Sequence, residues 1–268
     1  MGDNGRISAQ GGSRSVDRSM AVLLLLAKRG HLGIGEMARI LTIPKSSTAN
    51  VLRALVARNF VAQDRDGRYC LGLGTFEIGA AYLRAMTPTT SVQPELESLS
   101  GELSATSHFA VLDGDEVVYL ATHDSALRAL DLASSVGARL PAATTAVGKA
   151  QLAFLPARDD ERQLESSRFV EFTRIRILGY AVDDGGTVPG VACVAAPIFS
   201  PNGCCGAIGV STLISSQSKR EVIVEAIGAA AARATLRLGG VRPHVDALEL
   251  GHALQPDSET RLSGQTRT

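Results

Sequence analysis

Apolar residues recur at helical spacing in the first quarter of the chain, with polar or glycine-rich breaks between the repeats. Residues 15–29 predict a first helix, and residues 35–41 predict a short second helix after the break at 30–33. The expected inward face of the first helix is apolar and consists of Val16, Met20, Leu23, Leu24 and Ala27. These two segments predict the first half of a small helical domain.

A third helix is expected after a tight turn at Thr42 and Ile43, with Pro44 in its first turn, where proline is tolerated. Its apolar spacing separates two faces. The inward face contains Thr48, Val51, Leu52 and Leu55. The outward face is small, polar or basic and contains Lys45, Ser46, Ala49, Asn50 and Arg53. We therefore expect one side of this helix to pack and the other to face a partner.

A β-hairpin is predicted directly after the third helix. Residues 60–63 and 68–71 have the pattern of short strands, and the turn between them at 64–67 (DRDG) contains residue types that accept a positive φ. The order helix, helix, turn, helix, hairpin is typical of a winged helix-turn-helix domain.

The outward side of the third helix has the chemistry of a DNA-reading surface. Small side chains let a helix approach the major groove closely, lysine and hydroxyl groups contact phosphates, and Asn50 can reach a base edge. The residues predicted to contact DNA are Arg18, Lys45, Ser46, Ser47, Ala49, Asn50, Arg53, Arg65 and Arg68. The alternative is a protein-interaction module whose basic residues are only solvated.

The rest of the chain changes to alternating strand patterns. After a helix at 75–86, a linker at 87–94 and a helix at 95–104, strands are expected at 108–113, 116–122, 127–132, 191–199 and 205–213. A long helix at 219–238 follows, with Ser218 and Glu221 spaced as a capping box. This order predicts a mixed α/β domain of the α+β type, with one antiparallel sheet and flanking helices.

The expected domain organisation has five parts. They are a disordered N-terminus at 1–14, a winged helix-turn-helix domain at 15–74, a linker helix and linker at 75–94, an α+β domain at 95–239 and a flexible tail at 240–268.

Charge is divided unevenly along a chain whose net charge is zero. Residues 1–75 carry 11 lysines and arginines against 5 acidic residues, whereas the remaining 193 residues carry 16 against 22. This division indicates that only the first part of the chain binds a polyanion. Charge alone leaves DNA, RNA and a membrane surface open as that polyanion.

Membrane, secretory and metal-binding patterns are not found. The longest apolar run, at 20–27, is far shorter than the roughly 20 residues of a membrane helix, and the first 15 residues lack the apolar core of a signal peptide. We therefore expect a cytoplasmic protein with no membrane partner. The four cysteines and five histidines have no metal-binding spacing, so neither a metal nor a cofactor is predicted.

Catalytic chemistry has two candidates, and neither is complete. The dipeptide at 148–149 (GK) resembles the end of a phosphate-binding loop, but Ala143 and Ala150 stand where that motif needs a glycine and a hydroxyl residue. Cys193 and His108 can be drawn as a nucleophile and a base, yet nothing in their local sequence indicates activation. The prediction is that the chain is not an enzyme.

Taken in order, segments covering residues 13–239 resemble the IclR family of bacterial transcriptional regulators. The first domain contributes SVDRSMAVLLLLA, GIGEMARILTIPKSSTANVLRAL and FVAQDRDGRYCLG. The second contributes HFAVLDGDEVVYLA, VGARLPAATTAVGKAQLAFLP, GYAVDD and PGVACVAAPIFSPNGCCGAIGVST. The resemblance implies a winged helix-turn-helix followed by a GAF-like antiparallel-sheet effector domain. It also implies a homodimer or dimer of dimers bound to palindromic sites in double-stranded promoter DNA.

The resemblance further implies a small-molecule effector, typically a carboxylate or an aromatic acid, that changes promoter occupancy. The family's effector-site positions map to Ala146, Val147, Asp183, Cys193, Gly209 and Ser211. Repression is favoured over activation because blocking a polymerase needs only occupancy of the promoter.

The sequence departs from the family pattern at three places. Asn50 stands where an arginine is common, and Gly185-Gly186-Thr187 stands where glutamates usually follow GYAVDD. The segment from Lys149 to Gly179 is also shorter than usual, and the missing part would normally supply a helix and part of the pocket wall. The alternative function is therefore a constitutive DNA-binding dimer with a non-responsive effector domain.

Overall fold

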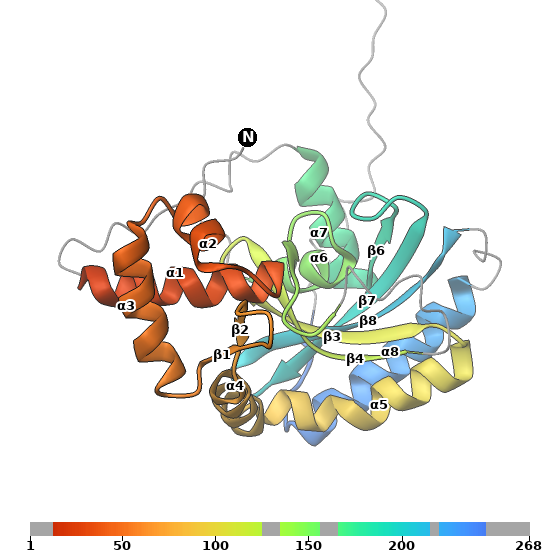
Figure 1. Ribbon diagram of the computed structural model, residues 1–268. Helices are drawn as coiled ribbons and strands as arrows, with labels where there is room; N and C mark the ends of the chain where they lie inside the picture. Colours follow the sequence, from red (N-terminus) through yellow and green to blue (C-terminus); the bar gives the residue numbers. More distant parts are fainter. Residues whose placement is uncertain (1–12, 125–134, 156–165, 215–219, 245–268) are drawn as a thin grey trace, which may run out of the picture. The chain divides into compact units, whose positions relative to one another are not determined.

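The computed structural model describes residues 13–124, 135–155, 166–214 and 220–244. The chain divides into two compact units, Met1–Ala85 and Met86–Thr268. The first is a helical unit with a hairpin, and the second contains a six-stranded sheet (Figure 1). The predicted fold class, a helix-turn-helix unit followed by an antiparallel-sheet domain, is confirmed. Across the described residues, no helix combines the length and apolar character needed to cross a bilayer.

The first unit consists of α1 (Arg14–Arg29), α2 (Ile34–Leu41), α3 (Lys45–Val56), β1 (Val61–Gln63), β2 (Tyr69–Leu71) and α4 (Leu73–Ala85). Its core takes side chains from α1, α2, α3 and the hairpin, and contains Val22, Leu26, Leu32, Met37, Val51, Leu52, Leu55 and Val61. Thr48 is fully buried on the same side of α3. The predicted inward face of α3 is therefore confirmed.

The predicted inward face of α1 is wrong for Val16, Met20, Leu24 and Ala27, which are exposed, whereas Leu23 is half-buried against the core as expected. Val22 and Leu26 enter the core, whereas Val16, Met20 and Leu24 are 55%, 53% and 63% exposed. Helix α1 is apolar on two sides, and periodicity alone cannot tell which side packs within the unit. The exposed positions follow each other at four-residue spacing and so form a continuous apolar stripe, the α1 stripe.

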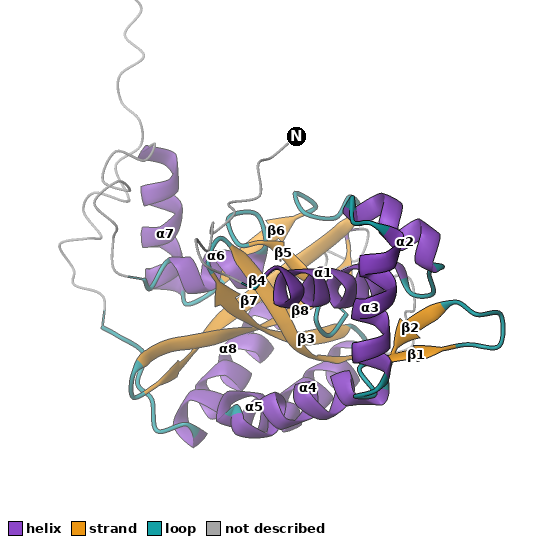
Figure 2. Ribbon diagram, turned by 60° about the vertical axis from the view of Figure 1, so that its left-hand side comes forward, coloured by secondary structure: helices purple, strands orange, loops and turns teal. Residues whose placement is uncertain are grey.

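The second unit consists of α5 (Thr87–Leu103), β3 (Thr106–Asp113), β4 (Glu116–His123), β5 (Arg139–Pro141), α6 (Ala146–Leu152), α7 (Ser166–Leu178), β6 (Ala181–Asp184), β7 (Val191–Ser200), β8 (Gly203–Leu213) and α8 (Arg220–Arg237). The strands pair antiparallel in the order β5-β4-β3-β8-β7-β6. Helices α5 and α8 cover one face of the sheet, and α6 packs on the other (Figures 1 and 2).

The core under α6 is built mainly from small side chains. It contains Ala110, Tyr119, Ala146, Val147, Ala195 and Ala207 among others. Gly148 shows how closely the chain packs here, because a Cβ at this position would lie 2.1 Å from the carbonyl oxygen of Ala142. Alternate residues of β3, β4, β6, β7 and β8 point toward α6, so any polar residue at these positions faces this core.

Two expectations for the second unit need correction. Residues 87–94, expected as a linker, form the first half of α5, with Pro94 inside the helix. The strand and helix patterns also fail to predict β5, α6, α7 and β6, of which the strands are only three or four residues long. The segment before Gly179 contains α7, so the shortened part of the chain retains a helix. The strand expected at 127–132 and Ser218 of the capping box lie outside the described residues.

Candidate DNA-binding surface and effector site

Helix α3 presents a polar side opposite its core side. The residues on this polar side are exposed or half-buried, and they are Lys45, Ser46, Ser47, Ala49, Asn50 and Arg53. Because the helix begins at Lys45, the backbone N–H groups of Lys45, Ser46 and Ser47 lack partners within the helix. Phosphate oxygens are the natural acceptors for such a helix start.

The side chain of Asn50 is oriented by a neighbour one turn away. Nη1 of Arg53 donates a hydrogen bond of 3.2 Å to Oδ1 of Asn50. This contact leaves the amide NH₂ of Asn50 to donate to an acceptor on a base edge. The bidentate pairing of asparagine with adenine uses both amide atoms, so it would require Arg53 to move.

The hairpin β1–β2 is fastened to the helical part at its turn. Oδ1 of Asp64 accepts hydrogen bonds from the backbone N–H groups of Asp66 (3.0 Å) and Arg68 (2.9 Å), and Oδ2 lies 2.8 Å from Nδ1 of His31. The hydrogen bond with His31 holds the pKa of the Asp64 carboxyl below its usual value. Arg68 donates to the backbone carbonyl of His31. Arg68 therefore holds the hairpin in place, whereas Arg65 is exposed in the turn.

The remaining predicted DNA contact, Arg18, lies half-buried on α1 rather than on α3. The predicted residues thus fall into three groups, on α1, on the outward side of α3 and on the hairpin. A groove-reading helix flanked by cationic side chains can contact both base edges and phosphates.

The six predicted effector residues converge on the sheet face under α6. Across β6, β7 and β8, Asp183 pairs with Cys193, and Cys193 pairs with Ser211. In the next row on the same face, Gly209 of β8 pairs with Ala195 on one side and with His108 of β3 on the other. Asp183 and Ser211 are buried, and Cys193 is half-buried.

Ala146 and Val147 are the first two residues of α6, directly above this face. Thr145 caps the helix, since its Oγ1 accepts a hydrogen bond of 3.1 Å from the backbone N–H of Gly148. Both residues are buried. As the first N–H groups of a helix, those of Ala146 and Val147 lack an acceptor within it, which suits them to donate to an anionic or carbonyl group.

His108 is the residue of this site that sequence reasoning did not assign to it. Its side chain is fully buried, and burial lowers its pKa to about 4. Nε2 lies 3.6 Å from Sγ of Cys193, the ring makes an edge contact with Tyr119 at 5.2 Å, and Nδ1 has no partner among the described residues. Burial raises the pKa of Cys193 to about 12, so both partners are neutral near pH 7. A neutral thiol beside a neutral imidazole is not an activated nucleophile.

Asp183 is held by the glycine-rich loop that departs from the family pattern. Oδ1 accepts a hydrogen bond of 2.8 Å from the N–H of Gly186, and Oδ2 accepts one of 3.3 Å from the N–H of Thr187. The hydroxyl of Thr187 lies 3.3 Å from that of Thr144, just before the cap of α6. The loop therefore fixes the carboxylate at the edge of the site.

Lys149 joins three elements around the site. Its Nζ lies 2.9 Å from Oε1 of Glu171 on α7 and 3.5 Å from the carbonyl oxygen of Val182 on β6. Arg176 of α7 also donates to the carbonyl of Ala153, just after α6, at 3.0 Å. These contacts show that α7 is anchored to α6, and that Lys149 has a structural partner in place of a nucleotide phosphate.

Comparison with known proteins covers both units. Residues 80–235 match the family described as bacterial transcriptional regulator IclR C-terminal, and residues 15–65 match the IclR helix-turn-helix domain. The chain is 31% identical to the HTH-type transcriptional regulator BhcR of Paracoccus denitrificans over 261 residues, covering 89% of this chain and 91% of BhcR. It is 30% identical to the HTH-type transcriptional repressor AllR of Escherichia coli over 236 residues, covering 79% of this chain and 83% of AllR.

Solved structures share the fold at lower sequence identity. An IclR homolog from Microbacterium hydrocarbonoxydans, crystallised with 4-hydroxybenzoate, superposes with a TM-score of 0.72 at 19% identity. The match covers 84% of this chain and 99% of the other.

Proposed function

The chain belongs to the IclR family of bacterial transcriptional regulators, and from that premise we propose that it is a sequence-specific, promoter-binding repressor controlled by a small carboxylate or aromatic acid. The observation that carries the proposal is the convergence of Asp183, Cys193, Gly209 and Ser211 with the start of α6 on one sheet face. This arrangement is the proposed effector site, and the outward side of α3 is the proposed reader of the operator.

The mixed lining of this sheet face supports an organic acid as effector. Apolar side chains such as Tyr119 and Val147 can cover a hydrocarbon or aromatic body, while polar groups sit at defined positions. N–H groups at the start of α6 can donate to a carboxylate. The neutral His108 can donate or accept one hydrogen bond through Nδ1, so it suits a hydroxyl or a carboxyl oxygen of the ligand. The related fold crystallised with 4-hydroxybenzoate makes that acid a reasonable first probe.

Homodimerisation is supported by the α1 stripe. Val16, Met20 and Leu24 present apolar surface that no described part of the chain covers. Helix α4 adds exposed apolar residues, including Phe76 at 69% and Tyr82 at 55% exposure. Contiguous exposed apolar surface marks interaction sites, and a dimer would place two α3 helices on the half-sites of a palindrome.

Control of DNA binding follows from linkage. An effector that binds one arrangement of the dimer more tightly shifts the population able to span two half-sites. A coupling of about 1–3 kcal/mol corresponds to roughly 5- to 150-fold in operator affinity. Such a regulator is proposed to act in the cytoplasm, where promoter DNA and metabolites meet.

Binding of the purified protein to the DNA upstream of its own gene, against random DNA of equal length across a salt series, tests the first half of the proposal. Selective binding at moderate salt is expected, and equal binding to both at every salt concentration argues against it. A panel of organic acids, starting with 4-hydroxybenzoate, then tests release from the selected operator. If the protein binds the operator but no acid of the panel binds the protein or releases it from the DNA, the alternative of a constitutive DNA-binding dimer is favoured.

A further inference from the structure

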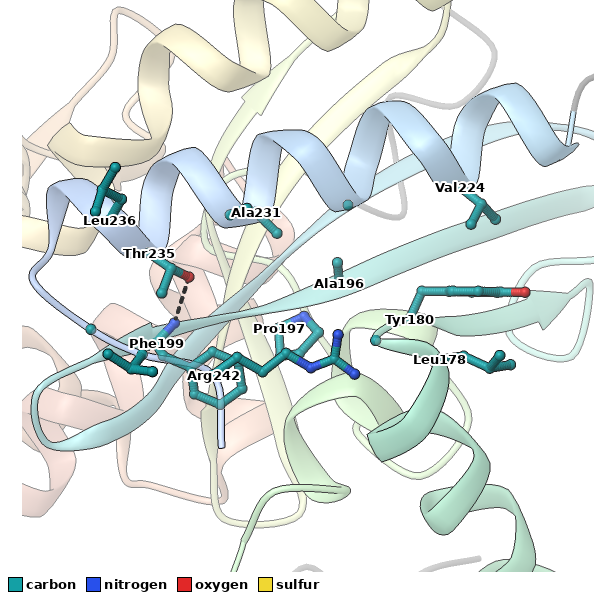
Figure 3. A pocket seen from close by; sticks show the side chains of 15 residues that line it. Leu178, Tyr180, Ala196, Pro197, Phe199, Val224, Ala231, Thr235, Leu236 and Arg242 are labelled. Atoms are coloured by element: carbon teal, nitrogen blue, oxygen red, sulfur yellow. Dashed lines mark hydrogen bonds between the residues drawn. The ribbon is translucent and has the colours of Figure 1, made fainter. Parts of the chain in front are cut away.

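The sheet face opposite the proposed effector site holds a cavity, named the second cavity here because it is distinct from that site. It has a volume of about 460 Å³ and is enclosed by β7, α8, the end of α7 and the segment after α8. Its walls are mostly apolar and include Leu178, Pro197, Phe199, Val224, Ala231 and Leu236 (Figure 3). The volume falls within the range of small-molecule sites.

Arg242 is the cationic residue of this cavity. Helix α8 ends in a turn in which Gly239 has φ +69° and the N–H of Gly240 donates to the carbonyl of Thr235 at 3.0 Å. Gly240 then passes so close to β7 that a Cβ there would lie 2.2 Å from the carbonyl oxygen of Phe199. This close approach brings Arg242 over the cavity, where its side chain runs past Phe199 and Pro197 (Figure 3).

The guanidinium of Arg242 is held in place by backbone carbonyl groups but is not paired with a carboxylate of the described residues. Its Nη2 donates to the carbonyl oxygens of Arg176 (2.5 Å) and Ile177 (3.0 Å) at the end of α7. Gly179 makes room for it, since a Cβ there would lie 2.3 Å from Nη1. Among the described residues no acidic side chain pairs with Arg242, and burial lowers its pKa. Arg242 as a whole is exposed, so an anion from solution can reach its guanidinium and accept charge-assisted hydrogen bonds from it.

Besides Arg242, the polar side chains that line the cavity are those of Tyr180 and Thr235 (Figure 3). The hydroxyl of Thr235 already accepts a hydrogen bond of 3.1 Å from the N–H of Phe199. At the rim, Leu236 and Val241 are 79% and 82% exposed, which extends the apolar surface beyond the cavity. The lining therefore fits a molecule with one acidic group and an otherwise apolar body.

We propose that this cavity binds a medium-chain monocarboxylate, with the carboxylate on Arg242 and the hydrocarbon chain along α8. The site shares no residue with the proposed effector site. On β7, Ala196 faces this cavity, whereas Ala195 and Cys193 belong to the core under α6. Binding here is thus independent of the effector proposal.

Sodium octanoate is the first probe, and 1-octanol, which has the same chain without the charge, is its control. Isothermal titration calorimetry on the full chain should show saturable octanoate binding and at least about tenfold weaker octanol binding, because the charged hydrogen bonds are lost. Arg242→Met should reduce octanoate affinity by a similar factor while leaving octanol binding unchanged. Equal octanoate affinity in the wild type and Arg242→Met, or no octanoate binding at all, overturns the proposal.

A second variant separates cavity occupancy from the structural role of Arg242. Gly228 lines the cavity from α8, and a Cβ there would meet no atom within 4 Å. Gly228→Leu should therefore fill the cavity without a backbone clash and abolish octanoate binding. Gly101→Leu, at an exposed glycine of α5 that also meets no atom within 4 Å, should bind octanoate like the wild type. Octanoate binding that survives Gly228→Leu contradicts the assignment.

Gly209→Ala tests whether octanoate binds at the effector site instead, because the added methyl group would contact His108 and Val147, and neither residue lines the second cavity. Binding that persists in Gly209→Ala and disappears in Gly228→Leu supports the second cavity. The reverse pattern places octanoate under α6 and rules out the second site.

Discussion

Sγ of Cys193 on β7 lies 3.6 Å from Nε2 of His108 on β3, although β8 runs between these two strands. The contact is possible because Gly209 of β8 has no side chain, and a Cβ there would lie 2.4 Å from Nε2 of His108. The glycine thus shapes the polar end of the proposed effector site. This relationship connects a residue that the family resemblance indicated with one that it did not.

Gly209→Ala should close this gap and weaken effector binding. The added methyl group would also lie 2.9 Å from Cγ1 of Val147, so both His108 and the start of α6 must shift. Overpacking of this kind costs about 1–3 kcal/mol of folding free energy. Thermal unfolding should show this loss of stability. The variant should still bind the operator, but the acid should release it from the operator less effectively than it releases the wild type. An unchanged ligand response would remove Gly209 from the site.

Burial of neutral His108 should make folding stability depend on pH. Its folded pKa of about 4 lies below the unfolded value of 6.5, so the unfolded chain binds more protons between these values. Stability is therefore lost as the pH falls from 6.5 to 4, by up to about 3 kcal/mol. Denaturant unfolding of wild type and His108→Gln across this range measures the difference. If stability changes with pH in the same way in both proteins, His108 is not the group whose lowered pKa causes the loss.

Glu95→Gln should destabilise the second unit at neutral pH. The Glu95 carboxylate on α5 accepts hydrogen bonds from Arg233 and Arg237 of α8, each with a shortest distance of 2.6 Å. Burial raises its pKa, but the two guanidiniums outweigh burial, and the net pKa is lowered. The guanidiniums are about half exposed, so the expected loss is about 2 kcal/mol.

The matched control for this change is Glu97→Gln, at an exposed carboxylate on the same helix. It should leave the unfolding midpoint nearly unchanged. Because the pKa of Glu95 is lowered in the folded state, its contribution to folding stability is present above pH 4.5. That contribution is lost as the pH falls through the pKa of the folded state. Equal midpoints for the two variants at pH 7 would show that the α5–α8 ion pairs add no stability.

Lys45→Ala should weaken binding to all DNA sequences alike. Lys45 is exposed at the start of α3, where a phosphate contact carries no sequence information. The slope of log affinity against log salt concentration should fall by about one unit. Fluorescence anisotropy with operator and random DNA measures both slopes, and an unchanged slope removes Lys45 from the interface.

Asn50→Ala should instead reduce discrimination between sequences. Its amide is oriented by Arg53 on the outward side of α3, and loss of a base contact costs roughly 1–3 kcal/mol at one base pair. Binding to single-base variants of the operator locates that base pair. Equal losses on operator and random DNA would show that Asn50 does not read a base.

Features that depend on residue spacing within a single helix or strand are predicted best from the sequence. The two faces of α3 follow from spacing within one helix, and the structure places Thr48, Val51 and Leu52 inside. Which side of α1 packs depends on contacts with other elements, so the expectation for Val16 and Leu24 was wrong. Likewise, the effector positions came from resemblance, whereas His108 joins them only because strand pairing places it beside Gly209.

A ligand bound under α6 is proposed to control DNA binding by α3. The most direct test is the dissociation constant of the operator complex with and without a saturating acid from the panel, measured in wild type and Gly209→Ala. We expect the dissociation constant to change at least about fivefold in the wild type and much less in Gly209→Ala. An acid that binds the wild-type protein yet leaves its operator affinity unchanged would contradict the proposed control of DNA binding.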